Sequence, residues 1–207
     1  LQAQTDSYRR IRNTFRYLIG NLDGFTDKEK INENEFPDLE KYILHRLWEI
    51  DQIISDCVKN FNFHLMFTTL LNFCSNDLSA FYFDIRKDAI YCDGKDSKKR
   101  RSSRTLLDII FNYLVRWLAP SLSFTTEEAW KARGNKKSIH LEDFLNIPDA
   151  YRNTNLSETW IILKQIRKVI TGALEKKRAE KIIGSSLEAH IDIYVESSVI
   201  KKIENYS

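Results

Sequence analysis

The sequence predicts a mainly α fold, a helical bundle with a short α/β piece at the C-terminus, and three observations support this. Glycine and proline are scarce, at 6 and 3 of 207 residues, whereas sheet-rich folds need many turns. Apolar residues recur at intervals of three and four along most of the chain. After Gly184 the interval changes to two, which is typical of a strand.

Three stretches in the first part of the chain have helical spacing. Residues 8–19 form an amphipathic pattern that should end before Gly20. A second helix should begin at Phe36-Pro37, because proline suits a first helical turn, and should continue to about residue 61. A third covers residues 63–74, after which Ser75-Asn76-Asp77 interrupts the apolar pattern. We expect Asn76 or Asp77 to cap a new helix in which Phe81 and Phe83 are mostly core.

The second part of the chain alternates between helices and polar connections. Residues 102–117 predict a long helix that Pro120 stops, and residues 125–128 (TTEE) read as a capping box that opens a short one. Residues 133–155 are irregular, and a helix with a basic outer face resumes at residues 160–174. Residues 187–195 alternate as a strand, which cannot be a stable sheet alone, and residues 199–203 suggest a short helix.

These patterns suggest two parts: residues 1–155 as the helical bundle, and residues 156–207 as a basic helix followed by the strand and short helix. The chain starts at Leu1 within a helix-like pattern, so we expect it to be a piece of a longer protein. Three cysteines without a CxxC pair suggest free thiols in a reducing compartment. No apolar run is long enough to span a membrane, and we expect a cytoplasmic protein.

The sequence contains no convincing catalytic or metal-binding motif. Its glycines cannot form GxGxxG or a phosphate-binding loop, GxSxG is absent, and the four histidines lack metal-ligand spacing. Neighbouring carboxylates such as Glu127 and Glu128 are more simply explained by a helix start. His64 is better explained by packing or capping than by catalysis.

Basic residues are concentrated in a few segments. Residues 95–104 hold six Lys or Arg residues against one Asp, and residues 164–181 hold seven against two Glu residues. Such segments could bind the phosphates of a nucleic acid, although from charge alone solvated helix faces are the simpler explanation.

Several motifs in chain order resemble those of isoleucyl-tRNA synthetases. They are SYRRIRNTFRYLIGNLDGF (7–25), NFCSNDLSAFYFDIRKDAIYCD (72–93), VRWLAPSLSFTTEEAW (115–130), SIHLEDF (138–144) and ALEKKRAEKIIGSSLEAHIDIY (173–194). The stretch FYFDIRKD favours this family over the valine and leucine relatives. Each motif alone is modest, but together they span nearly the whole chain and are highly specific.

The resemblance implies the helical anticodon-binding domain of a class I aminoacyl-tRNA synthetase of bacterial or organellar type, with the start of its C-terminal junction. The whole enzyme would be a monomer that joins isoleucine to tRNA(Ile) with ATP and Mg²⁺. This chain lacks the HIGH-like and KMSKS-like motifs, so we expect it to be non-catalytic on its own. Its partners would be tRNA(Ile) and the catalytic and editing domains of the parent. Many members end in a zinc module, but no cysteine follows Cys92 here.

The bundle would hold the anticodon stem-loop so that the acceptor end reaches a distant active site. The candidate RNA-binding residues fall in three groups: Arg9, Arg12, Asn13 and Arg16; Lys98, Lys99, Arg100, Arg101 and Arg104; and Lys164, Arg167, Lys168, Lys176 and Lys177. The first group could instead brace the link to the catalytic domain, and each arginine could form a salt bridge inside the bundle.

Two other readings remain open. The chain could be the anticodon domain of a valyl- or leucyl-tRNA synthetase, with the same architecture and another tRNA. It could also be a helical protein-interaction module whose basic faces are merely solvated.

Overall fold

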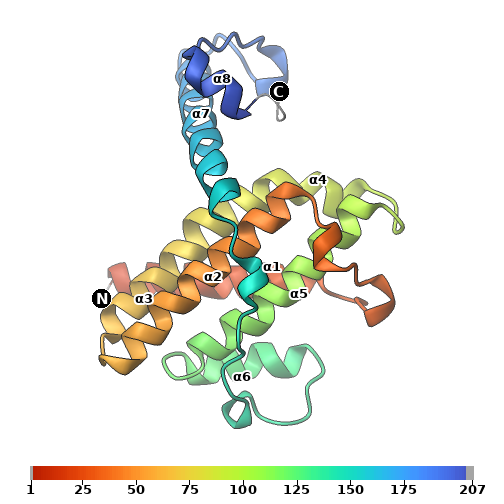
Figure 1. The fold of residues 1–207 in the computed structure, drawn as a ribbon, viewed down its shortest axis with the longest axis vertical. Coiled ribbons are helices and arrows are strands. Elements are labelled where there is room, and N and C mark those ends of the chain that lie inside the picture. Colours follow the sequence, from red (N-terminus) through yellow and green to blue (C-terminus); the bar gives the residue numbers. More distant parts are fainter. Residues whose placement is uncertain (1, 204–207) are drawn as a thin grey trace. The chain divides into compact units, whose positions relative to one another are not determined.

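Helices make up nearly all the regular structure of residues 2–203, the part of the chain that the computed structural model describes (Figure 1). One compact unit ends at Arg152 and a second begins at Asn153. The predicted mainly α fold is therefore confirmed, and the sequence-based division after residue 155 stays a prediction.

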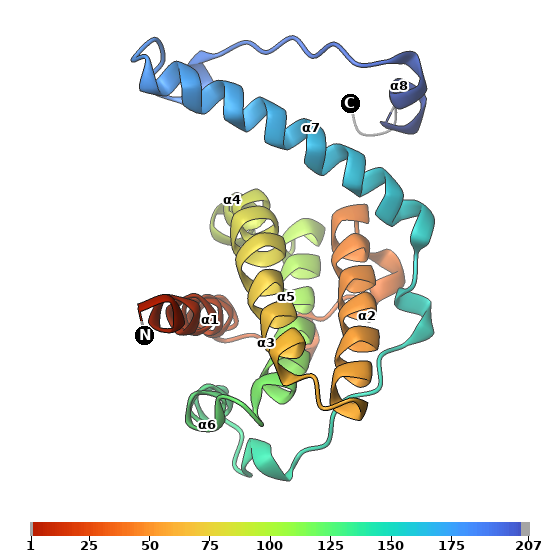
Figure 2. The ribbon, with the colours of Figure 1, turned by 90° about the vertical axis from the view of Figure 1, so that its left-hand side faces the viewer.

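The first unit is a bundle built around α5 (Lys98–Leu118), which packs against α1 (Gln2–Asn21), α2 (Asp38–Lys59), α4 (Asp84–Cys92) and α6 (Ser123–Ala132). Figure 2 shows α2 and α3 (Phe63–Asn72) running side by side, and α5 also packs along α2. From Leu106 onward the inward face of α5 is mainly apolar and includes Leu106, Ile110, Leu114 and Trp117, each with no exposed surface. Burying such side chains is the main favourable term in folding.

Several predicted helix limits need correction. α1 continues through Gly20 to Asn21, and α5 begins four residues before Ser102 because the Ser97 side chain caps it by accepting a hydrogen bond from the backbone N–H of Arg100. The capping box at Thr125 is wrong, since α6 already begins at Ser123 and has no side-chain cap. The predicted start of α2 at Phe36-Pro37 is slightly early, since the helix begins at Asp38 and Pro37 is its N-cap residue.

The predicted break at Ser75–Asp77 is also wrong. The chain passes from α3 into a π-helical segment, η3 (Phe73–Phe83), and on into α4, with right-handed helical dihedrals at both junctions. Asp77 does not cap a helix, because its carboxylate accepts a hydrogen bond from Arg46 of α2 at 3.3 Å. The partner lies 31 residues away, so local spacing could not reveal it.

The wide turns of η3 bury three consecutive aromatic residues against different neighbours. Phe81 meets the ring of Tyr42 edge to face, at 6.2 Å between centroids. Phe83 stacks on Tyr17 of α1 at 4.0 Å. Since Tyr82 lies between them with no exposed surface, the predicted core role of this corner is confirmed.

A buried ionic network joins α2, η3, α4 and α5. The Glu40 carboxylate has no exposed surface and accepts two hydrogen bonds from Arg86, at 2.6 Å from Nε and 2.8 Å from a terminal nitrogen. The Tyr82 hydroxyl donates to it at 3.0 Å, and Ser103 Oγ lies 3.3 Å away. Burial raises the pKa of Tyr82 well above its usual value, which keeps the hydroxyl a donor.

Within residues 2–152, the regular structure of the connections between helices consists of short 3₁₀ turns: η1 (Asp27–Glu29), η2 (Glu33–Glu35), η4 (Ile139–Leu141) and η5 (Asp149–Tyr151). Residues 133–153 are otherwise irregular, as predicted. Cys57 and Cys74 are buried free thiols, and Cys92 is exposed.

The second unit consists of α7 (Thr154–Ala179), a 3₁₀ turn η6 (Ser186–Glu188) and α8 (Ser197–Ile203). The strand predicted at residues 187–195 is wrong for this structure, since no strand occurs within the described residues 2–203. Extended backbone without a neighbouring strand has no ladder of hydrogen bonds to join, and the described chain supplies no such neighbour.

The buried network yields a stability prediction. Glu40→Ala should lower the free energy of unfolding by about 3–5 kcal/mol, because it leaves the Arg86 guanidinium buried without its partner. Tyr82→Phe should cost only about 1 kcal/mol, since it removes one hydrogen bond. Urea unfolding followed by circular dichroism measures both.

The double variant Glu40→Met with Arg86→Met should recover most of the loss, because no unpaired charge remains. An equal cost for Glu40→Ala and Tyr82→Phe would contradict the central role of the ion pair.

Candidate nucleic-acid interface

The first candidate group forms an exposed stripe on α1. Arg9, Arg12, Asn13 and Arg16 recur at helical spacing and are all exposed. The buried residues of α1 lie on the opposite side of the helix and include Ile11, Phe15 and Leu18. A surface with several guanidinium groups and an amide can bind phosphate oxygens and other acceptors of a nucleic acid.

Within this stripe, Arg12 also connects α1 to α6. Its guanidinium lies 3.1 Å from the Glu128 carboxylate, and the side chains are 50% and 64% exposed. Next to this pair, Tyr8 OH and Thr125 Oγ1 lie 3.0 Å apart. The pKa of Tyr8 is lowered, first by the hydrogen bond with Thr125 and then by Arg12. Such an exposed pair contributes little to stability, so Arg12 can exchange this partner at low cost.

The other two arginines of the stripe have weaker ties or none. Arg9 lies 3.5 Å from Asp6 on the same exposed helix face. Arg16 has no ion pair with any residue in the described range 2–203, and it lines a groove of about 340 Å³ between α1 and α6. The remaining lining is mainly apolar: Phe15, Ile19, Gly20, Ala129 and Ala132, with Arg12, Thr125 and Glu128.

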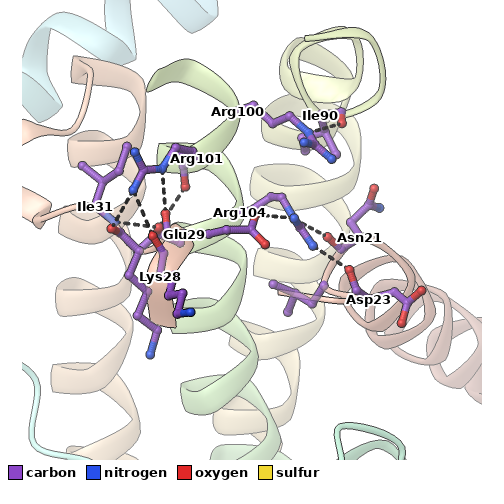
Figure 3. Close-up of polar contacts among 12 residues, drawn as sticks. Asn21, Asp23, Lys28, Glu29, Ile31, Ile90, Arg100, Arg101 and Arg104 are labelled. Carbon is purple, nitrogen blue, oxygen red and sulfur yellow. Dashed lines mark hydrogen bonds and ion pairs between the residues drawn. The ribbon is translucent and has the colours of Figure 1, made fainter. Parts of the chain in front are cut away.

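The second candidate group, on α5, divides into two kinds of residue. Lys98 and Lys99 are exposed in the first turn, whereas Arg100 and Arg101 are half-buried and Arg104 is buried. Figure 3 shows the three arginines directed toward protein oxygen atoms. Arg100 Nε donates to the backbone oxygen of Ile90 at 3.1 Å.

Arg101 and Arg104 hold the loop of residues 21–31 (Figure 3). Arg101 donates to the backbone oxygens of Glu29, Lys28 and Lys30 at 3.1–3.4 Å. Arg104 donates to those of Asn21 and Asp23, at 3.1 and 2.6 Å, and pairs with the Glu29 carboxylate. These guanidinium groups satisfy carbonyl oxygens at the end of α1 and around the short turn η1, which so few residues cannot all pair by themselves.

The third candidate group lies along α7 of the second unit. Lys164, Arg167 and Lys168 share one side of the helix, whereas the 3.6-residue period turns Lys176 and Lys177 to other sides. Lys168 and Lys176 are exposed, and Lys177 pairs with Glu180 at 3.0 Å. Lys164 and Arg167 are half-buried and each has an interaction partner. The five residues therefore do not form one continuous face.

Two residues that the sequence reasoning did not select belong to these surfaces. Lys95 is exposed just before α5, next to Lys98 and Lys99, and its position in the same basic run could have revealed it. Glu128 is the partner of Arg12 across 116 residues, and no local pattern indicates such a contact.

The neighbouring carboxylates of Glu127 and Glu128 do not form a catalytic pair, because they bind different partners. Glu127 accepts hydrogen bonds from Ser138 Oγ and the backbone N–H of Ile139, each at 2.9 Å, while Glu128 turns to Arg12. The Ile139 hydrogen bond, followed by that of Ser138, lowers the pKa of Glu127. His64 is exposed at the start of α3, so the expected packing of its side chain does not occur.

The described residues provide neither a metal site nor a membrane-spanning helix. Across residues 2–203, no three His, Cys, Asp or Glu side chains are grouped so that they could hold a metal ion. Over the same residues, every helix is too short or too polar to span a bilayer.

Known proteins with similar sequences carry tRNA-ligase names. The sequence model of a family described as "Anticodon-binding domain of tRNA ligase" matches residues 40–193. The isoleucine--tRNA ligase of Pelagibacter ubique is 48% identical over 209 residues, which cover 99% of this chain and 23% of that protein. The isoleucine--tRNA ligases of Bartonella henselae and Zymomonas mobilis are 47% and 44% identical, with 99% and 97% of this chain covered. The matches cover 21% and 22% of those two proteins, so the chain spans less than a quarter of these relatives.

The contacts on α5 predict opposite roles for its basic residues. Arg104→Ala should lower the free energy of unfolding by about 2–3 kcal/mol, because it leaves Glu29 and two loop carbonyl oxygens without their charged donor. The double variant Lys98→Ala with Lys99→Ala should change it by less than about 0.5 kcal/mol, since both side chains are exposed. Guanidinium chloride unfolding of the two variants tests the difference.

Arg104→Lys serves as the matched control. It should not restore stability, because one ammonium group cannot reproduce the planar fork that reaches three acceptors. A fully stable Arg104→Ala protein would refute the supporting role.

Proposed function

The chain belongs to the family of anticodon-binding domains of tRNA ligases, and from this premise we propose that it binds the anticodon stem-loop of tRNA(Ile). The near-complete match of the chain to proteins named isoleucine--tRNA ligase carries this proposal. Those relatives also confirm the family resemblance that the sequence motifs indicated.

The role proposed for the domain is positional. The bundle holds one end of a long RNA so that the other end reaches the active site of the parent enzyme, which joins isoleucine to tRNA(Ile). Accurate positioning converts the encounter of two reactants into a step within one complex. A bundle with a close-packed core suits this task, because it resists deformation under the load of a bound RNA.

Other properties of the parent enzyme follow from the resemblance and are also proposals. The parent is a cytoplasmic monomer whose catalytic domain precedes α1. Its ATP and Mg²⁺ bind outside this chain, as does any zinc ion of a C-terminal module.

We propose that the RNA contacts come from the outward basic residues. Arg9, Arg12, Asn13 and Arg16 supply one surface, and Lys98 and Lys99 a second. The α7 residues Lys164, Arg167, Lys168, Lys176 and Lys177 supply further phosphate contacts. Arg100, Arg101 and Arg104 act indirectly, because their guanidinium groups already hold backbone oxygens of the protein.

The proposed phosphate contacts predict a salt-dependent affinity. Binding of tRNA(Ile) should weaken steeply with rising salt, because each neutralised phosphate releases condensed counterions. Arg9→Ala with Arg16→Ala should reduce the slope of log K against log[salt] by roughly 1.4–1.8, given about 0.7–0.9 per contact. Filter binding between 50 and 300 mM salt provides the measurement.

The control variant is Lys87→Ala, which removes an exposed cation of α4 that pairs with Asp84 and lies outside the proposed surfaces. It should leave the slope unchanged. A flat salt response of the unmodified chain, or no binding, would favour a protein-interaction module.

The identity of the tRNA is tested separately. Competition among purified tRNAs for isoleucine, valine and leucine should show the highest affinity for tRNA(Ile). Preference for either of the others would assign the chain to the valyl or leucyl relatives instead, while leaving the anticodon-binding role intact.

A further inference from the structure

Two phenylalanine rings stand exposed at the turn between α2 and α3. Phe61 is 78% exposed and Phe63 is 57% exposed, and their rings meet edge to face at 6.1 Å between centroids. Val58 in the last turn of α2 and Leu65 in the first turn of α3 are also more than 40% exposed. We call Phe61 and Phe63 the aromatic tip. Exposed apolar groups gathered in this way mark binding surfaces more often than isolated ones do.

The backbone at the tip is unfavourable for the residue that occupies it. Phe61 has a φ of +54° and follows the end of α2, where the backbone N–H of Asn62 donates to the oxygen of Cys57 at 2.8 Å. This is the helix-ending motif in which glycine is preferred, because a Cβ in the left-handed region meets the backbone. The ring of Phe61 also buries little within this chain, so folding of the chain alone does not account for a phenylalanine here.

The chemistry of the tip fits a protein surface better than a nucleic acid. Residues 57–66 contain a single formally charged side chain, Lys59, which precedes the two asparagines and the two rings. Depletion of charge and enrichment in aromatic residues are typical of the buried centre of protein interfaces. RNA-binding surfaces depend on several cations for phosphate affinity, as on the exposed stripe of α1.

The tip lies on the same side of the first unit as the start of α1. In Figure 1 the start of α1 and the α2–α3 turn lie toward the same side, and both face the viewer in Figure 2, which looks at that side. The relatives are more than four times as long as this chain, so a large part of the parent lies outside it.

We propose that the aromatic tip docks against the catalytic part of the parent enzyme. This inference rests on the proposed function, in which that part precedes α1 and therefore lies on the side of the bundle that the tip also faces. The two rings then enter an apolar site on the catalytic part and fix the direction in which the bundle projects. Phe61 and Phe63 are positioning residues, since they set the path of the RNA without touching it.

Hydroxyl-radical footprinting of the isolated chain and of the full parent enzyme, both without RNA, tests the docking. Modification of Phe61 and Phe63 should fall at least fivefold in the parent. Tyr91, which is 66% exposed on α4, serves as the reference for the comparison. Equal modification of the tip in both proteins would overturn the proposal.

Two further outcomes would also overturn it. Protection that occurs only when tRNA is added would make the tip an RNA contact. Protection in the isolated chain that grows with its concentration would make it a contact between two copies. Loss of tRNA binding by the unmodified parent would refute the proposed function, whereas the footprint without RNA would still report on docking.

Phe61→Gly provides a second test with a change of sign. Glycine relieves the left-handed backbone, so the thermal midpoint of the isolated chain should stay the same or rise by a few degrees. In the parent enzyme the same change should raise KM for tRNA severalfold, with little effect on isoleucine activation by ATP. A parent variant with unchanged KM for tRNA would contradict the positioning role.

Discussion

The bundle depends on the ion pair and hydrogen bonds that the buried Glu40 carboxylate forms. This carboxylate carries a charge at a position without solvent, which is unfavourable unless hydrogen bonds and an opposite charge compensate it. Arg86 and Tyr82 provide that compensation from α4 and η3, and Ser103 of α5 lies against the same oxygen. Because each partner must be placed accurately, the network specifies how α2, η3, α4 and α5 meet.

The π-helical segment is the local consequence of that requirement. Wide turns let Tyr82 reach Glu40 while its two neighbours, Phe81 and Phe83, pack on Tyr42 of α2 and Tyr17 of α1. A regular α-helix separates consecutive side chains by about 100°, which makes it difficult to bury three in a row. The aromatic cluster that could have been taken for a reactive site is therefore a structural joint.

Arginine has two roles in this protein, and the distinction governs the proposed interface. Arg101 and Arg104 point inward and hold backbone oxygens of residues 21–31, whereas Arg9 and Arg16 point into solvent. The sequence places all four in basic stretches and cannot separate the two kinds. Their difference arises from a loop that lies about 75 residues before α5 in the chain.

The sequence by itself determined the helical class, the approximate extent of most helices and the family, because apolar periodicity and ordered motifs are local properties of the chain. It misjudged the Ser75–Asp77 corner and the capping box at Thr125, since Asp77 contacts Arg46 and Thr125 contacts Tyr8 across long separations. Only the tertiary structure decided which basic residues face outward and which are occupied, because burial depends on what distant segments bring alongside a helix. The strand-like pattern near residue 190 also depends on other segments, since a strand forms only when a neighbouring strand is present.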